Sequence, residues 1–219
     1  MSTVNPHYTF QYVQPEAYRY SHDSVFFARW VYEQVKSSKI KCNAILDLCA
    51  GCGIIGMDLL FHLDRNPTTA SLVTEIDFLE IQSNYSSYFE ENKQALLSRL
   101  KHPAALSFLN INYNQLSKDH KKYDLIVANP PYFRQGHGTL SHSEFKNRCR
   151  FFIDADLKTL VSAISFSLDS RGKAYVLLKS LHEHGINICD EIKEFDFNIK
   201  IENVGLIRGV DIYEITANY

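Results

Sequence analysis

The amino-acid sequence predicts an α/β fold with a mainly parallel, seven-stranded β-sheet that is covered by helices on both faces. Short apolar runs alternate with helical patterns along most of the chain, which is the order expected of a parallel sheet. The last two runs follow each other directly and indicate a hairpin. The 219 residues are enough for one domain with a substantial core and few for two.

Each expected element is defined by the spacing of its apolar residues. Strands are predicted at residues 44–48, 71–75, 105–110, 123–128, 173–178, 197–206 and 210–216. Helices are predicted at residues 24–35, 54–62, 77–97, 154–168 and 181–192. The final strands meet at Gly209, so the hairpin would place one antiparallel strand in the sheet.

The first forty residues differ from the rest of the chain. They are rich in tyrosine and hold one expected helix rather than an alternation of strands and helices. We therefore predict that residues 1–40 form a lid or an extra layer of the same domain, and that residues 41–219 form its main body.

Composition favours a cytoplasmic protein. Hydrophobic residues make up 45% of the chain, but no apolar run reaches the roughly 18 to 20 residues of a membrane helix, and the N-terminus lacks the pattern of a secretory signal. Five cysteines, an odd number, do not indicate a disulfide framework. The net charge of −2 counts against extensive phosphate binding, although a local basic patch can still bind RNA.

A glycine-rich turn follows the first predicted strand, in the segment ILDLCAGCGIIG. Gly51 and Gly53 allow the backbone to turn tightly and to approach a ligand. Glu75, with Ile76 after it, is expected at the end of the second strand, where a carboxylate can accept hydrogen bonds from both hydroxyls of a ribose. These features predict an adenosine-binding site at the carboxyl ends of the first strands.

The same glycine spacing also fits a dinucleotide site, because residues 51–56 read G-x-G-x-x-G. Asp47 favours S-adenosylmethionine instead, since an acid before the loop can bind its ammonium group but would sit badly beside a pyrophosphate. A strand–turn–helix corner without a ligand is the structural alternative. Cys49 is expected to line the loop. Cys49 and Cys52 have no second cysteine pair, so no metal site is predicted.

The tetrapeptide Asn129-Pro130-Pro131-Tyr132 directly follows the fourth predicted strand. An exocyclic amine on adenine is a poor nucleophile because its lone pair is delocalised into the ring. The Asn129 side-chain oxygen and the Pro130 carbonyl can accept hydrogen bonds from such an amine and localise that lone pair. Tyr132 offers an aromatic face to a planar target. The alternative is that the tetrapeptide is only a turn.

DLCAGCGIIG with a later NPPY resembles the amino-group methyltransferases of the Rossmann-like class. More narrowly, PEAYRYSHDSVFFARWV (residues 15–31) resembles the N-terminal signature of bacterial tRNA(Val) adenine-N6 methyltransferases, in which an aromatic-x-aromatic-Ser-x-Asp stretch lines the cofactor pocket. ANPPYF (residues 128–133) and the NRCR stretch (residues 147–150) also match that family. The likeness extends from residue 15 to about residue 178.

The resemblance implies that residues 41–219 are an S-adenosylmethionine-dependent methyltransferase domain acting on N6 of an adenine in RNA, with the anticodon loop of a tRNA favoured. It also implies that Tyr20 and Asp23 contact the cofactor, and Asn129 is predicted to contact the cofactor as well as the target amine. The family usually has an acid after the third strand that contacts the cofactor's adenine. Asn110 and Asn112 stand there in this chain, and either of them is expected to make that contact, with Asn112 taken as the candidate cofactor-binding residue. The Glu that the family often has shortly after the downstream Arg is missing after Arg150.

The connection after the NPPY tetrapeptide is long and carries several basic side chains. Long connections in compact domains tend to be functional or disordered, and basic groups here could contact phosphates beside a flipped-out base. A solvated charged loop is the alternative. The predicted partner is RNA, bound by a monomeric protein without membrane or metal partners. The predicted substrate-binding residues are Pro131, Tyr132, Phe133, Arg134, Arg148 and Arg150.

Three other functions stay open on sequence grounds. The side-chain amide of a glutamine, in a protein such as a release factor, is planar like adenine and can also use NPPY. The N-terminal aromatic stretch favours RNA, since the glutamine enzymes usually carry a separate helical domain before the catalytic one. An NAD(P)-dependent oxidoreductase and a catalytically silent, methyltransferase-like binding module are the remaining hypotheses.

Overall fold

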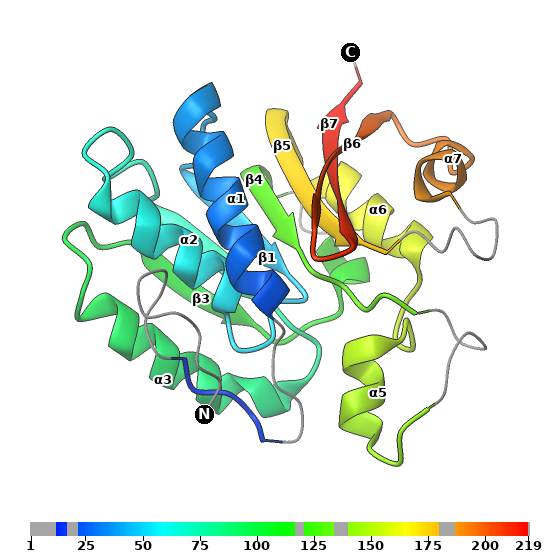
Figure 1. Ribbon diagram of the computed structural model, residues 1–219, viewed down its shortest axis with the longest axis horizontal. Coiled ribbons are helices and arrows are strands. Elements are labelled where there is room, and N and C mark those ends of the chain that lie inside the picture. Colours follow the sequence, from blue (N-terminus) through cyan, green and yellow to red (C-terminus); the bar gives the residue numbers. More distant parts are fainter. Residues whose placement is uncertain (1–11, 17–21, 117–120, 134–139, 180–186, 219) are drawn as a thin grey trace.

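A seven-stranded sheet forms the centre of the molecule in the computed structural model (Figure 1). The structure describes residues 12–16, 22–116, 121–133, 140–179 and 187–218. The strand order is β3-β2-β1-β4-β5-β7-β6, and among these strands β7 alone runs in the direction opposite to the others. The strands are β1 (Ala44–Leu48), β2 (Glu75–Leu79), β3 (Ala105–Leu109), β4 (Tyr123–Ala128), β5 (Leu168–Leu178), β6 (Ile199–Ile207) and β7 (Val210–Ala217).

Helices cover both faces of this sheet. One face is covered by α1 (His22–Ser38), α2 (Ile54–Arg65) and α3 (Ser86–Leu97), whose buried residues share one apolar core with the sheet. The opposite face is covered by α6 (Leu157–Ser167) and α7 (Ile188–Lys193), which belong to a second core. The remaining elements are η1 (Ser83–Tyr85), η2 (Tyr113–Gln115) and α5 (Glu144–Arg150).

The central strands are apolar because both of their faces are covered. All six residues of β4, YDLIVA, are buried, and four of the five residues of β1 are buried. Near-continuous apolar strands are typical of parallel sheets with helices on both sides. These observations confirm the predicted α/β class, the mainly parallel sheet and the C-terminal hairpin.

The second strand was predicted in the wrong place. It covers Glu75–Leu79 instead of residues 71–75, which belong mostly to the connection after α2. The actual strand contains an acid, Asp77, in the middle of its apolar pattern. Asp77 is buried, accepts a hydrogen bond from the Tyr123 hydroxyl at 2.8 Å and forms an ion pair with Lys121. Because this acid interrupts the apolar pattern, the run before it gave the stronger strand signal.

Several other boundaries also differ from the prediction. The third helix begins at Ser86 rather than at residue 77, because β2 occupies the preceding segment. Helix α6 was predicted to begin at residue 154 and begins at Leu157. The Asp156 side chain accepts a hydrogen bond from the Thr159 N–H at 2.7 Å and caps the helix there. Helix α5 was not predicted, and residues 181–186 of the last predicted helix lie outside the described residues.

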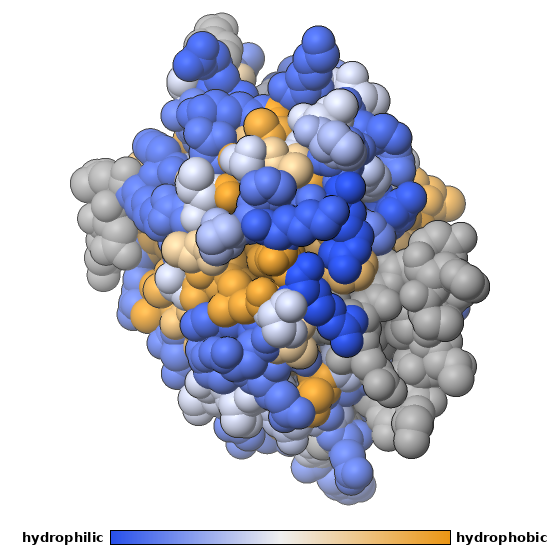
Figure 2. Space-filling model, turned by 90° about the vertical axis from the view of Figure 1, so that its left-hand side faces the viewer, coloured by the Kyte–Doolittle hydropathy of each residue, from blue (hydrophilic) through white to orange (hydrophobic). Residues whose placement is uncertain are grey.

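The outer surface is mixed in polarity. Figure 2 shows the face on the left-hand side of Figure 1, where hydrophilic side chains surround a central apolar area. Such mixing is ordinary on the exterior of globular proteins. None of the helices in the described residues is long and apolar enough to cross a membrane.

The strand order determines where a ligand can bind. From the neighbouring strands β1 and β4 the sheet extends in opposite directions, to β2 and β3 on one side and to β5 on the other. Such a switch point leaves a crevice outside the carboxyl ends of the strands. The loops after β1, β2, β3 and β4 all reach this crevice.

Candidate active site

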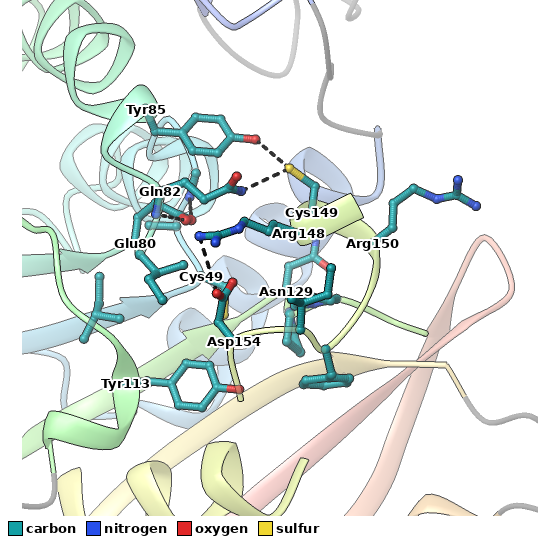
Figure 3. A pocket seen from close by; sticks show the side chains of 18 of the residues that line it. Cys49, Glu80, Gln82, Tyr85, Tyr113, Asn129, Arg148, Cys149, Arg150 and Asp154 are labelled. Carbon is teal, nitrogen blue, oxygen red and sulfur yellow. Dashed lines mark hydrogen bonds and ion pairs between the residues drawn. The ribbon is translucent and has the colours of Figure 1, made fainter. Parts of the chain in front are cut away.

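A pocket lies at the carboxyl ends of β1 to β4 (Figure 3). Its first side, here called the glycine wall, consists of residues 49–52, 54 and 55 after β1 and residues 79–82 at the end of β2. Its second side, here called the NPPY wall, consists of residues 129–133 after β4 and residues 148–155 around the end of α5. The predicted glycine loop and the predicted tetrapeptide therefore face the same pocket.

The glycine loop turns sharply through left-handed backbone conformations. Gly51 has a φ angle of 55° and Gly53 of 85°, while Cys49 adopts 59°, which is uncommon for a residue with a side chain. Gly51 and Cys49 line the pocket. Gly53 does not line it. It caps α2, and a Cβ atom there would come within 2.8 Å of the Met57 side chain, so this glycine shapes the turn.

Asp47 does not reach the pocket, contrary to the prediction that it would contact the cofactor. Its side chain is wholly buried beneath the loop, where Oδ2 accepts a hydrogen bond from the Gly56 N–H at 2.8 Å. Gly56 lies in the first turn of α2, so the Asp47 carboxyl group caps this helix although it belongs to β1, nine residues earlier in the chain. Burial raises the pKa of Asp47 to about 7, against the opposing effect of the Gly56 amide.

The acid of the glycine wall is Glu80, and not Glu75 as predicted. Glu75 begins β2 at the opposite edge of the sheet, where it forms an ion pair with Lys121 at 3.1 Å. Glu80 follows the last residue of β2, lines the pocket and is 6% exposed. Ile76 is likewise buried within β2, and Ile81 lines the pocket in its place. With the strand placed correctly, an acid at its carboxyl end would have identified Glu80.

The Glu80 carboxylate is held by backbone amides. Oε2 accepts a hydrogen bond from the Gly51 N–H at 3.0 Å, and Oε1 accepts one from the Gln82 N–H at 2.9 Å. Burial raises the pKa of Glu80, while these amide donors act in the opposite direction. The contact with Gly51 ties the end of β2 to the loop after β1, so the two parts of the glycine wall are fixed relative to each other.

The two asparagines after β3 have different positions. Asn110 donates to the backbone carbonyls of Glu80 and Ile81 at 2.8 and 3.0 Å, and so supports the end of β2 from outside the pocket. Asn112 lines the pocket, as predicted. Its side chain accepts a hydrogen bond from the Asn114 N–H and donates one to the Asp154 carbonyl, both at 3.1 Å.

The tetrapeptide Asn129 to Tyr132 lines the pocket throughout. The Tyr132 hydroxyl donates a hydrogen bond to Asn129 Oδ1 at 2.7 Å, and the Asn129 amide group donates to Ser24 Oγ at 3.1 Å. The amide of Asn129 is thus oriented from both ends, with its oxygen beside Tyr132. The oxygen that was predicted to polarise a target amine is engaged by the protein's own tyrosine in this state.

The residues after NPPY are joined to those after α5. The Phe133 N–H donates to the Arg150 carbonyl at 2.9 Å, and the Phe152 N–H donates to the Phe133 carbonyl at 2.8 Å. Both Phe133 and Arg150 line the pocket, as predicted. The Arg150 guanidinium lies over the rings of Phe133 and Phe151, and Figure 3 shows its side chain pointing away from the other labelled residues. Arg134 lies outside the described residues.

Arg148 extends across the pocket toward the glycine wall (Figure 3). Its guanidinium forms ion pairs with Asp154 at 3.4 Å and with Glu144, its neighbour one turn earlier in α5, at 3.1 Å. Sequence reasoning had identified Arg148 but had not identified Asp154, which is brought to the pocket by the segment between α5 and α6.

The predicted N-terminal contacts are only partly in the described residues. Tyr20 lies outside them. Asp23 is not a lining residue of the pocket, contrary to the prediction. It belongs to the first turn of α1, and its carboxylate pairs with Arg208 at 3.0 Å, in the turn between β6 and β7. The next residue, Ser24, lines the pocket and contacts Asn129 instead.

Three cysteines line the pocket as thiols. Burial raises the pKa of Cys52 to about 12, and it also raises the pKa values of Cys49 and Cys149. Cys149 Sγ lies 3.2 Å from the Tyr85 hydroxyl oxygen and 3.4 Å from Gln82 Nε2, which connects α5 to the glycine wall. Within the described residues, no group of three or more His, Cys, Asp or Glu side chains could hold a metal ion.

Comparison with curated proteins finds methyltransferases. No family model matches the chain. The chain is 28% identical over 158 residues to a tRNA1(Val) (adenine(37)-N6)-methyltransferase of Shewanella sediminis, and 31% identical over 134 residues to one of Christiangramia forsetii. These matches cover 69% and 59% of this chain. A release factor glutamine methyltransferase of Clostridium botulinum is 26% identical over 113 residues, 52% of this chain. The matches span 59%, 50% and 35% of the respective relatives.

Solved structures give the fold class. A T. thermophilus 16S rRNA methyltransferase in complex with AdoMet and guanosine matches with a TM-score of 0.60 and 14% sequence identity, over 93% of this chain and 45% of that one. TrmN from Thermus thermophilus matches with a TM-score of 0.57 and 14% identity, over 89% and 48%. The chain therefore has the fold of the Rossmann-like, S-adenosylmethionine-dependent methyltransferases. Within that class it is similar in sequence to the tRNA1(Val) adenine-N6 enzymes, as its motifs predicted.

Proposed function

We propose that this protein is an S-adenosylmethionine-dependent N-methyltransferase that acts on N6 of an adenine in RNA, with a tRNA anticodon loop as its leading substrate. The observation that carries the proposal is the shared pocket, in which the NPPY tetrapeptide faces a glycine loop bound to a buried acid. The methyltransferase relatives support the enzyme class and the cofactor. We further propose that it works in the cytoplasm, where tRNA is available, as a monomer.

The glycine wall has the donors and acceptors that an adenosine group needs. Each Glu80 oxygen receives one backbone hydrogen bond and keeps acceptor capacity for a ribose hydroxyl. Gly51 gives the ligand close access to the backbone, and Ile81 adds an apolar surface beside the acid. When bound, S-adenosylmethionine supplies the activated methyl group. The residues of the wall bind and orient it, and the pocket limits access of water.

The same contacts disfavour a dinucleotide. A pyrophosphate would bind to the amides of the glycine loop and to the positive end of α2. The Gly51 amide already donates to Glu80, and the Gly56 amide in the first turn of α2 already donates to Asp47. The carboxyl groups occupy the positions at which pyrophosphate charge would otherwise be stabilised, so an NAD(P)-dependent oxidoreductase is the weaker hypothesis.

The NPPY wall would polarise the target amine. An adenine amine placed between Asn129 Oδ1 and the Pro130 carbonyl can donate one hydrogen bond to each, which localises its lone pair for attack on the methyl group. The Tyr132 hydroxyl occupies one of the two acceptor sites of Asn129 Oδ1, and we propose that the amine displaces it. The tyrosine ring would then be available to stack on the base. The exchange replaces one hydrogen bond by another, so the Asn129 oxygen stays paired.

Basic groups surround the outer rim of the NPPY wall. Arg150 lies over the Phe133 ring at 5.5 Å from its centroid, and the Lys179 ammonium lies over the same ring at 5.9 Å. Such groups are suited to the phosphates on either side of a flipped-out nucleotide. A local patch of this kind is compatible with the net charge of −2, because phosphate contacts depend on charge near the site.

A glutamine amide in a protein is the second candidate substrate. The match to a release factor glutamine methyltransferase favours it specifically, and a planar amide could bind between the same two acceptors. Its nitrogen, like that of adenine, has a delocalised lone pair. The geometry of Asn129 and Pro130 therefore serves both targets.

One assay separates the two substrates. The protein is incubated with radiolabelled cofactor and either unmodified total tRNA or a purified release factor, and the products are analysed as nucleosides and as peptides. The expected product is N6-methyladenosine in tRNA. Methylated glutamine together with unmodified tRNA would transfer the proposal to the second substrate, and no transfer to either would contradict the proposed activity.

A further inference from the structure

Two carboxylates, Glu80 and Asp154, line the described part of the pocket, and the proposed function gives a ligand only to Glu80. Glu80 lies on the glycine wall and is held by the amides of Gly51 and Gln82. Asp154 lies on the NPPY wall, between α5 and α6, and its side chain is 24% exposed. Burial raises the pKa of Glu80, and the charge of Asp154 adds to this effect, as expected when both groups face one cavity.

The side-chain amide of Asn112 is engaged by the protein at both its oxygen and its nitrogen. Its oxygen accepts a hydrogen bond from the Asn114 N–H, and its nitrogen donates one to the Asp154 carbonyl. The Asn112 side chain therefore fixes the backbone of Asp154. These contacts give Asn112 a positioning role toward the neighbouring acid.

The Asp154 carboxylate has capacity for another donor. Arg148 contacts Oδ1 at 3.4 Å, which is long for a charged hydrogen bond. A carboxylate has two oxygens and about four acceptor sites, so this contact leaves most of them open. Arg148 also pairs with Glu144 at 3.1 Å and would keep that partner if a ligand displaced it from Asp154.

An adenosine group has donors at two ends. Its ribose presents two hydroxyls, and its base presents an exocyclic amine several ångströms away. We propose that Asp154 accepts a hydrogen bond from the exocyclic amine of the cofactor's adenine while Glu80 holds the ribose, so that Asp154 selects adenine over a base with a carbonyl at that position. This inference rests on the proposed cofactor. It does not depend on which substrate is methylated.

The selection follows from the chemistry of the two bases. Replacing the amine of adenine by the carbonyl of hypoxanthine moves the hydrogen-bond donor to the ring nitrogen N1 and places an acceptor at the position that faces the carboxylate. The hydrogen bond to the charged group is lost, so the preference for adenine should be about 10- to 100-fold. In an Asp154→Asn variant the carboxamide can accept from the amine or donate to the carbonyl, which should reduce the preference to less than about 3-fold.

The test compares S-adenosylhomocysteine with its inosine analogue by titration calorimetry on the full chain. Wild type should show the preference, and Asp154→Asn should lose most of it. Glu144→Gln is the matched control, because it removes the other ion pair of Arg148 and should leave the preference unchanged. Thermal unfolding of each variant checks that it is folded.

The two ways in which the inference could fail are distinguishable. If Asp154→Asn weakens both ligands equally, or keeps the full preference, Asp154 is structural and the inference is overturned while the cofactor assignment stands. If wild type binds neither ligand, the proposed cofactor fails and the inference fails with it. A second measurement needs no variant: an analogue with hydrogen in place of the amine should bind wild type about 10-fold more weakly or worse, and equal binding would also overturn the inference.

Discussion

The two walls of the pocket differ in how their polar groups are engaged. On the glycine wall, backbone amides hold Glu80 through contacts that a ligand can join without breaking them. On the NPPY wall, side chains are paired with one another: Tyr132 with Asn129, and Arg148 with Asp154. The first wall is therefore prepared for its ligand, while on the second wall the proposed target amine would displace the Tyr132 hydroxyl from Asn129. The contrast predicts that variants of the glycine wall will affect cofactor binding, whereas variants of the NPPY wall will affect binding and methylation of the substrate.

Asn129→Ala should have the largest effect, and on methyl transfer alone. The variant removes an acceptor that acts on the target amine in the transition state, so the rate should fall by about 100- to 1,000-fold. Cofactor affinity should stay within about 2-fold, because Asn129 contacts Ser24 and Tyr132 rather than the glycine wall. Single-turnover transfer to tRNA and calorimetry with S-adenosylhomocysteine measure the two quantities.

Asn129→Asp sharpens this prediction. A carboxylate still accepts hydrogen bonds, so partial activity should return relative to the alanine variant. Full activity in Asn129→Ala would show that the NPPY tetrapeptide is only a turn. Loss of cofactor binding in that variant would show that the two walls are not separable.

Asp47→Asn should change the pH dependence of stability. In the folded protein the pKa of Asp47 is raised to about 7, so its proton is kept until the pH approaches that value. The unfolded chain releases the proton near the ordinary pKa of 3.8. The folded state binds more protons between these values, so the contribution of Asp47 to stability is complete below about pH 4 and is lost as the pH rises to 7. Between about pH 5 and pH 8 the wild type should lose about 2 to 3 kcal/mol that the variant keeps.

The measurement is urea unfolding of both proteins across this pH range. The carboxamide oxygen that the substitution introduces can still accept a hydrogen bond from the Gly56 N–H, so the cap is retained. The informative quantity is the difference between the two stability profiles, because other titrating groups cancel in it. Parallel profiles would mean that Asp47 titrates normally beneath the loop.

Glu80→Ala should weaken cofactor binding by about 2 kcal/mol, or about 30-fold, because charged hydrogen bonds to the ribose are lost. Glu75→Ala is the matched control, since it removes a carboxylate from the same strand at the opposite edge of the sheet. That variant loses only the half-exposed ion pair with Lys121, and its affinity should be unchanged. Calorimetry with S-adenosylhomocysteine measures both affinities. If Glu75→Ala weakened binding and Glu80→Ala did not, Glu75 would be the ribose ligand.

The sequence was sufficient for the class of fold and for most of the NPPY wall. Local patterns located β4 to the residue, and the tetrapeptide after it had to lie at the carboxyl edge of the sheet. The acid of the glycine wall could not be located in the same way, because Asp77 is buried by a tertiary contact with Lys121 and Tyr123 that no local pattern reveals. Placing this one strand too early in the chain moved the predicted acid from one edge of the sheet to the other.

Asp154 is a second acid of the pocket that local sequence patterns did not identify. It lies far beyond Glu80 in the chain, and it reaches the pocket because Asn112 holds its carbonyl and because the Phe133 and Phe152 backbones are joined. These contacts form between segments that are distant in sequence. Asn112 was predicted from the resemblance to a known family and Arg148 from the basic segment after NPPY, whereas the acid that both of them contact was found only through the fold.

Tyr132→Phe should have the smallest effect and is the closest test of the exchange on the NPPY wall. The hydroxyl donates to Asn129 Oδ1, and in the proposed exchange the target amine replaces it. Removing the hydroxyl frees the oxygen while keeping the ring for stacking, so KM for tRNA should change by less than about 3-fold and kcat should not fall. Tyr132→Ala, which also removes the ring, should weaken tRNA binding, measured as KM, by about 1 to 3 kcal/mol, the contribution of a base–aromatic stack. Steady-state methylation of tRNA by both variants separates the hydroxyl from the ring. If kcat falls about 10-fold or more in Tyr132→Phe, the hydroxyl takes part in catalysis and does not merely occupy the acceptor before the base arrives.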